Sequence, residues 1–163
     1  MLKLSVIIIA LVLNISCNEE NIEENQKPLE LTAENIEGEW TRIGIYKSTD
    51  PSGKNLPNEN LMDSIDDCRK DDIIKYTLSS DSPNIRYWGY NNDICEGQEK
   101  NKFIELGTWI LDSTGNLYYY YSDVQESYKI IELNRTDLLI RKSSGIKEND
   151  VINYYFEKYE RQN

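Results

Sequence analysis

The densest group of residues that could do chemistry is a run of five aspartates, Asp63, Asp66, Asp67, Asp71 and Asp72. Carboxylate oxygens suit Ca²⁺, and the common calcium loop spaces them as Asp-x-Asp-x-Asp-Gly with a glutamate further on. The five aspartates miss that spacing, and no downstream glutamate completes it. We therefore interpret the run as a solvated acidic loop and predict no metal site, with calcium as the alternative.

Catalytic chemistry has little support in the sequence. The chain contains no histidine, which removes the commonest general base and the commonest metal ligand. It also lacks a Ser/His/Asp set, a Cys/His pair, a phosphate-binding glycine loop and an HExxH motif. These absences predict a protein that is not an enzyme and uses no cofactor.

The net charge of the chain limits the classes of molecule that it can bind. With 18 Lys+Arg against 29 Asp+Glu, the formal net charge is −11. A field of this sign repels phosphate backbones, so we expect no nucleic-acid partner. It suits a neutral or cationic ligand, but a solvated acidic surface is the plainer explanation of the charge.

Aromatic residues form the second candidate group. The chain has 12 tyrosines against 2 phenylalanines, a composition that suits sheets with one solvated face. Trp88, Trp109 and the run 118–121 could line a ligand cavity or a sugar-binding face. Because side chains alternate along a strand, two of these four tyrosines face each side of the sheet. We take Tyr119 and Tyr121 as the pair that could line the cavity or the aromatic face. Aromatic core packing is the plainer alternative.

The first 16 residues have the pattern of a signal peptide. Lys3 precedes an apolar run over 4–13, which at about ten residues is too short to span a bilayer as a helix. The run ends in Leu13-Asn14-Ile15-Ser16-Cys17, which resembles a bacterial lipobox with Asn14 where the motif prefers leucine. The resemblance implies cleavage before Cys17 and acylation of this residue, and several acyl chains anchor a protein stably.

An acidic segment separates Cys17 from the rest of the chain. Residues 17–30 combine low hydrophobicity, repeated glutamates and Pro28, which predicts a disordered tether. Acidic residues after the lipidated cysteine also resemble the surface-export signal of Bacteroidetes-type lipoproteins. We therefore expect an outer-membrane location with a lipid anchor, the domain lying at the cell surface or on the periplasmic face.

Two cysteines remain beyond the tether, Cys68 and Cys95. An even pair in an exported protein predicts a disulfide. Metal binding is the rival interpretation, but two thiols without histidine make a poor ligand set. We expect the disulfide.

Short strands with turn residues between them follow from residue 38 onward. Apolar and polar residues alternate over most of these segments, and loops of hairpin length connect several of them. A helical turn capped by Thr32 over 32–37 and a short helix over 59–66 are also expected. The eight expected strands cover 38–47, 74–78, 85–90, 103–111, 117–122, 128–133, 137–142 and 151–159. This pattern predicts an all-β, antiparallel, up-and-down β-barrel of about eight strands over 31–163.

Several features in order resemble a lipocalin-like domain of a bacterial lipoprotein. The series starts at Gly38-Glu39-Trp40, passes Cys68 and Cys95, and continues through Gly107-Thr108-Trp109 to 128–133 and Leu138. The resemblance implies a closed barrel with the disulfide, in which Gly38 and Trp40 plug one end and a late arginine covers the tryptophan. Arg161 is the only arginine beyond the last expected strand.

Two functional hypotheses follow. In the first, a lipid-anchored, lipocalin-like barrel binds a small hydrophobic or amphipathic molecule without catalysis. In the second, the barrel is filled and its outer surface contacts a protein or glycan partner. An empty cavity of a few hundred Å³ favours the first, and a solid core with an exposed aromatic patch favours the second.

Overall fold

The computed structural model of the chain describes residues 24–91, 93, 95–99 and 102–162. The expected signal peptide, Cys17 and the start of the expected tether lie outside the described residues. In the part that is described, no helix is long and apolar enough to cross a membrane.

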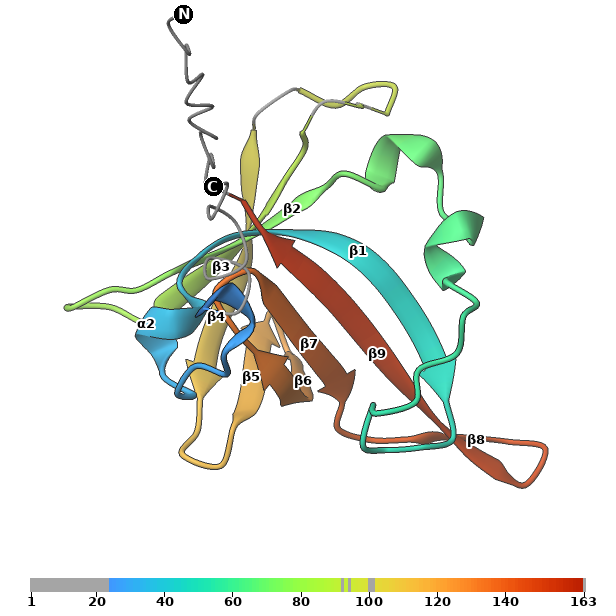
Figure 1. Cartoon of the computed structure of the whole chain (residues 1–163). Coiled ribbons are helices and arrows are strands. Elements are labelled where there is room, and N and C mark those ends of the chain that lie inside the picture. Colours follow the sequence, from blue (N-terminus) through green and yellow to red (C-terminus); the bar gives the residue numbers. More distant parts are fainter. Residues whose placement is uncertain (1–23, 92, 94, 100–101, 163) are drawn as a thin grey trace, which may run out of the picture.

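Eight of the nine strands in the described part of the chain pair into a closed antiparallel ring (Figure 1). The order around the ring is β1-β2-β3-β4-β5-β6-β7-β9, and pairing of β9 with β1 closes it. This is the predicted all-β, up-and-down fold class. The strands are β1 (Gly38–Ser48), β2 (Ile73–Thr77), β3 (Asn84–Gly89), β4 (Phe103–Leu111), β5 (Asn116–Tyr121), β6 (Val124–Leu133), β7 (Asp137–Lys142), β8 (Ile146–Glu148) and β9 (Val151–Arg161).

The observed strands differ from the expected ones at several ends, most at β6 and β9. β9 ends at Arg161 rather than at residue 159, so Arg161 belongs to the last strand. β6 begins at Val124 rather than at residue 128, because Ser122 adopts a positive φ of 51° and allows a tight turn out of β5. The short strand β8 was expected to be loop. It pairs with β9 alone and forms a hairpin that projects from the ring (Figure 1).

Short helical segments precede and follow β1. The helix α2 (Ala33–Ile36) is capped by Thr32, whose side chain accepts a hydrogen bond from the Asn35 N–H at 3.4 Å. The helix expected over 59–66 is a 3₁₀ turn, η1 (Leu61–Ser64), followed by a second one, η2 (Asp67–Arg69). Asn60 fixes the position of η1, because its side-chain oxygen accepts hydrogen bonds from the N–H groups of both Met62 and Ile45.

The end of the ring nearest α2 is closed by an aromatic core. Trp40 and Trp109 are fully buried there, and the Tyr76 ring meets that of Trp109 edge-on at 5.4 Å between centroids. The hydroxyls of Tyr76 and Tyr119 lie 2.6 Å apart, so these buried phenols satisfy each other. Burial raises the pKa of both tyrosines, which keeps them neutral inside the ring.

The first strand and the last strand meet at Trp40. The Trp40 indole N–H donates to the Ile36 carbonyl at 2.8 Å, and the Arg161 guanidinium lies 4.2 Å from the centre of its ring. Arg161 also donates to the Glu37 carbonyl at 2.7 Å. Gly38 makes this approach feasible, since its φ is 130° and a Cβ would lie 2.9 Å from the Arg161 side chain.

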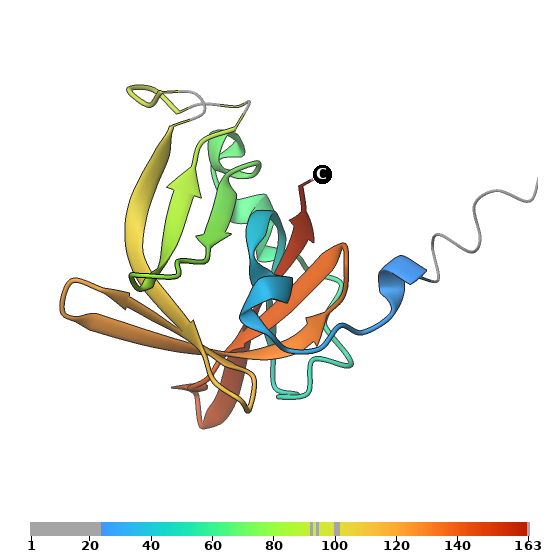
Figure 2. The ribbon, with the colours of Figure 1, turned by 90° about the vertical axis from the view of Figure 1, so that its left-hand side faces the viewer.

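Residues 24–30, which the sequence assigns to the expected tether, lie against the closed end of the ring. Leu29 packs on the core, and its N–H donates to the Leu133 carbonyl at 2.8 Å. Glu24 pairs with Arg135 at 2.8 Å. Figure 2 shows α2 and the segment before it lying across this end of the ring. This contact has a hydrophobic cause, because packing on the core removes part of the Leu29 side chain from water even though the segment around it is acidic.

Candidate ligand-binding cavity

A cavity of about 310 Å³ lies where β2 begins, away from the end that α2 covers. One part of its wall is apolar and aromatic, and the other part carries charged and amide groups. This mixture is typical of sites that bind small molecules. The lining residues are Arg69, Asp72, Trp88, Tyr90, Gln98, Ile104 and Leu106.

A β-bulge shapes the apolar wall. Along the β3–β4 pair, Arg86 faces Gly107 but Tyr87 faces Glu105, so Leu106 is an extra residue on β4. Such a bulge re-aims a side chain, and Leu106 lines the cavity together with Ile104. Gly107 permits this geometry: its φ is 135°, and a Cβ there would lie 2.1 Å from the Tyr120 carbonyl oxygen.

Trp88 connects this wall to the neighbouring strands. It is paired with Ile74 on β2 and with Ile104 on β4, so the three side chains share one face of the sheet. The Arg42 guanidinium stands 5.6 Å from the centre of the Trp88 ring. The tryptophan is thereby held between a core residue, an arginine and the cavity.

The polar side of the cavity is held by a disulfide. Cys68 on η2 is bonded to Cys95 in the loop after β3, with 5.1 Å between their Cα atoms, so the predicted disulfide is confirmed. Two hydrogen bonds reinforce it: the Asp93 N–H donates to Asp71 at 3.1 Å, and the Cys95 N–H donates to Gln98 at 3.2 Å. These contacts position Arg69, Asp72 and Gln98.

Asp72 is the most unusual residue of the site. Its relative exposure is 4%, yet neither carboxylate oxygen accepts a hydrogen bond from the described residues. Burial raises the pKa of Asp72 to about 6. The nearby Trp88 indole N–H, which does not reach hydrogen-bond geometry, and the charges of Arg42 and Arg69 oppose that rise in pKa, whereas Asp71 adds to it. A buried carboxyl without a protein partner is costly to ionise.

The interior between the cavity and the core is filled with charged and phenolic groups. Arg86, two residues before Trp88 on β3, places its guanidinium 4.0 Å from the centre of the Tyr119 ring. Arg42 lies 3.7 Å from Glu157, which also accepts a hydrogen bond from the Tyr159 hydroxyl. The described side chains in this part of the interior are therefore polar, unlike the apolar wall of the cavity.

The four aromatic residues predicted as site residues lie in different parts of the structure. Of the four aromatic candidates, only Trp88 lines the cavity. Trp109 and Tyr119 are 0% and 2% exposed and belong to the core, and Tyr121 is half-buried on β5 outside the lining. Strand alternation tells which side chains face inward, not which part of the interior is empty, so it could not separate these three residues from Trp88.

The acidic run contributes one residue to the cavity, Asp72. Within the described residues, no three of its carboxylates or other ligating side chains come together as a metal site. Asp67 pairs with Lys70 at 2.7 Å, and Asp63 and Asp66 are exposed. Sequence reasoning placed Asp72 in the solvated loop. The one signal in the sequence that the Asp72 side chain could face the interior was its position directly before the alternating segment that forms β2.

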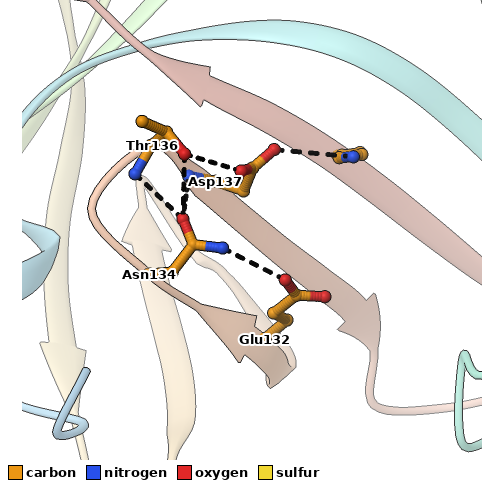
Figure 3. Close-up of polar contacts among 5 residues, drawn as sticks. Glu132, Asn134, Thr136 and Asp137 are labelled. Atoms are coloured by element: carbon orange, nitrogen blue, oxygen red, sulfur yellow. Dashed lines mark hydrogen bonds and ion pairs between the residues drawn. The ribbon is translucent and has the colours of Figure 1, made fainter. Parts of the chain in front are cut away.

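A second polar cluster, at the β6–β7 turn, is structural (Figure 3). Asn134, only 2% exposed, accepts hydrogen bonds from the N–H groups of Thr136 at 2.9 Å and Asp137 at 2.6 Å, and donates to Glu132 at 3.1 Å. Asp137 also lies 3.5 Å from Lys158 on β9. These groups satisfy one another and fasten the turn to the closed end, so they leave nothing for a ligand.

No protein-family profile matches the sequence, and no curated protein is similar to it. Among solved structures, the chain is similar to a deswapped triple mutant of bovine odorant binding protein. The two share 14% identity over 78% of this chain and 74% of the other, with a TM-score of 0.38. A similarity at this level carries no argument about ligands. The fold class rests on the strand pairings described above.

Proposed function

We propose that this protein binds a small amphipathic molecule in the cavity beside Trp88 and Asp72, without catalysing a reaction on it. The single observation that carries the proposal is a cavity of about 310 Å³ whose wall is apolar on one side and polar on the other. Pockets for small molecules occupy about 300–1,000 Å³, so this site suits a ligand at the small end of that range.

The filled interior limits the size of the ligand. Because Arg86, Glu157 and the tyrosine hydroxyls occupy the space next to the core, a long acyl chain would have to displace buried charged groups. A compact ligand with one apolar face against Trp88 and one polar group near Asp72 avoids that cost.

A cavity-filling substitution tests the proposal. Protein purified from its own host is examined by native mass spectrometry, and the displacement of a hydrophobic dye is measured. Ile104→Trp should fill the cavity and abolish both signals. Ile110→Trp, on the same strand but 53% exposed, is the matched control and should bind like the original protein. If the original protein carries no ligand and binds no dye, the proposal fails.

We also propose that the chain is a lipid-anchored protein of the cell envelope. Lys3, the apolar run 4–13 and the lipobox-like sequence ending at Cys17 support this. A domain anchored there could present its cavity to molecules that enter or leave the envelope.

The second candidate function is contact with a protein or glycan partner. The projecting β8–β9 hairpin favours it, since Ile146, Val151 and Ile152 are 45%, 46% and 52% exposed there. Replacing Ile146 and Ile152 by serine should leave ligand binding intact. If these substitutions abolish attachment of the protein to host glycans or surface proteins while Ile104→Trp has no effect, the second function replaces the first.

A further inference from the structure

We infer that the ligand enters the cavity with a cationic group, such as a primary amine, which pairs with the carboxylate of Asp72. This inference rests on the proposed function and specifies the class of ligand. It makes the cavity a site for a small aromatic or apolar amine.

The missing partner of Asp72 is the first argument. Several other carboxylates in the described residues pair with a lysine at short range, for example Glu39 with Lys75 at 2.8 Å and Glu126 with Lys142 at 3.1 Å. Asp72, in contrast, is 4% exposed and accepts no hydrogen bond from the described residues. A buried acceptor that lines a cavity is complemented by a ligand that donates.

The aromatic wall is the second argument. Trp88 and Tyr90 line the same cavity as Asp72. Aromatic ring faces attract ammonium groups, and tryptophan does so best. An amine beside Asp72 therefore meets a carboxylate and aromatic faces together, while the apolar part of the ligand contacts Ile104 and Leu106.

The basic residues near Asp72 do not take the place of a cationic ligand. Arg42 is engaged by Glu157 at 3.7 Å and stacks on Trp88. Arg69 lines the cavity but is exposed to solvent, so water screens its charge. Asp71 adds a negative charge close by, and Gln98 and Tyr90 are uncharged. Among the described residues that line the cavity, Arg69 is thus the one whose charge opposes a cation.

The surrounding charges favour a cation at longer range. The two segments that supply Arg69, Asp72 and Gln98 also carry the exposed acids Asp63, Asp66, Asp67, Asp93 and Glu96. The whole chain has a net charge of −11. A cleft edged by one sign of charge raises the local concentration of ligands of the opposite sign.

Three probes of one shape test the inference on the protein with its disulfide intact. Tryptamine is cationic, tryptophol is neutral and indole-3-acetate is anionic, and their affinities are measured by calorimetry at pH 7.5. Tryptamine should bind about tenfold more tightly than tryptophol, an advantage of the size expected for one partly buried charge pair. Asp72→Asn should remove this advantage and leave the affinity for tryptophol unchanged.

Two controls make the result specific. Asp66→Asn removes an exposed acid whose side chain caps nothing, and it should keep the preference for tryptamine. Lowering the pH from 7.5 to 5 protonates Asp72 and should abolish the preference in the original protein, whereas the Asp72→Asn variant should show no such change. Circular dichroism shows whether each variant is folded.

The possible failures are distinguishable. Equal affinities for tryptamine and tryptophol, or a preference for tryptamine that survives Asp72→Asn, overturns the cationic ligand but not the binding function. A preference for indole-3-acetate that is lost in Arg69→Gln also overturns it, in favour of an anion. If the three probes, the hydrophobic dye and host molecules all fail to bind, the proposed function fails together with the inference.

Discussion

Trp40 contacts both the beginning and the end of the folded chain. Its ring is fully buried under Arg161, and its N–H is satisfied by the Ile36 carbonyl. Arg161 in turn satisfies the carbonyl of Glu37, which follows α2. One aromatic ring therefore fixes the helix, the first strand and the last strand relative to one another.

Trp40→Ala should destabilise the protein by about 3–5 kcal/mol, the usual cost of emptying a buried aromatic site. The measurement is the free energy of unfolding in urea, followed by far-ultraviolet circular dichroism. Trp88→Ala, at a half-buried residue of the cavity, is the comparison and should cost less. A loss below about 1 kcal/mol for Trp40→Ala would contradict the role of this residue in closing the ring.

Asp72 is expected to weaken the fold at neutral pH. The folded state holds its proton up to about pH 6, whereas an ordinary aspartate ionises near 3.8. The folded state thus binds more protons between these values, so the stability falls as pH rises from about 4 to 6 and is level above that range. A strongly shifted pKa at a residue that lines a cleft is often the sign of a functional group.

Asp72→Asn should therefore raise the free energy of unfolding by about 1–3 kcal/mol at pH 7.5, since each pKa unit corresponds to about 1.4 kcal/mol. At pH 2.5 the gain should nearly vanish, because the carboxyl is then neutral in the folded state and almost entirely neutral in the unfolded state. Urea titrations at the two pH values measure this, with Asp66→Asn as the control. A variant that is less stable than the original protein at pH 7.5 would contradict the account.

At the scale of elements, the disulfide joins η2 to the loop after β3 and so forms the polar side of the cavity. The bulge at Leu106 forms the apolar side. The core, in contrast, is built by regular strands around the ring, including Ile74 and Tyr76 of β2 and Trp109 of β4.

Replacing both Cys68 and Cys95 by alanine should cost about 3–4 kcal/mol, the chain-entropy value for a loop of roughly this length. The affinity for the cavity ligand should fall as well, because Asp72 and Gln98 lose their fixed positions. Thermal unfolding and calorimetry measure the two effects. If affinity is unchanged in the folded double variant, the cavity does not depend on the disulfide.

The β6–β7 turn offers a second test at this scale. Asn134→Ala leaves the N–H groups of Thr136 and Asp137 without their acceptor, and buried unsatisfied groups cost about 1–3 kcal/mol each. A lower urea midpoint is expected. Asn58→Ala, in an exposed loop, is the control, and the cavity affinity should be unaltered in both variants.

At the scale of the whole molecule, the proposed lipid anchor determines where the cavity acts. Cells grown with an alkyne-labelled fatty acid should incorporate the label into the original protein and not into Cys17→Ser, and the variant should leave the membrane fraction. Cys68→Ser keeps Cys17 and should remain labelled. Labelling of Cys17→Ser would contradict anchoring at this residue.

The sequence by itself determined the strand pattern, because alternation along a strand and turn residues are local properties. It also predicted the disulfide, since two cysteines in a chain without histidine make a poor set of metal ligands, and it singled out Gly38 and Trp40 as the start of the fold. Where it failed locally, at β8 and at the start of β6, the turns lacked the usual glycine or proline signal, as Ser122 and Asn149 supply the positive φ instead.

Only the tertiary structure decided which side chains surround empty space. Trp88, Trp109 and Tyr119 all lie on inward faces, but core packing surrounds the last two and leaves Trp88 at the cavity. Asp72 belonged to an acidic run, and only the closure of the ring and the disulfide buried it without a partner. Burial and emptiness depend on residues distant in sequence, so no local pattern could reveal them.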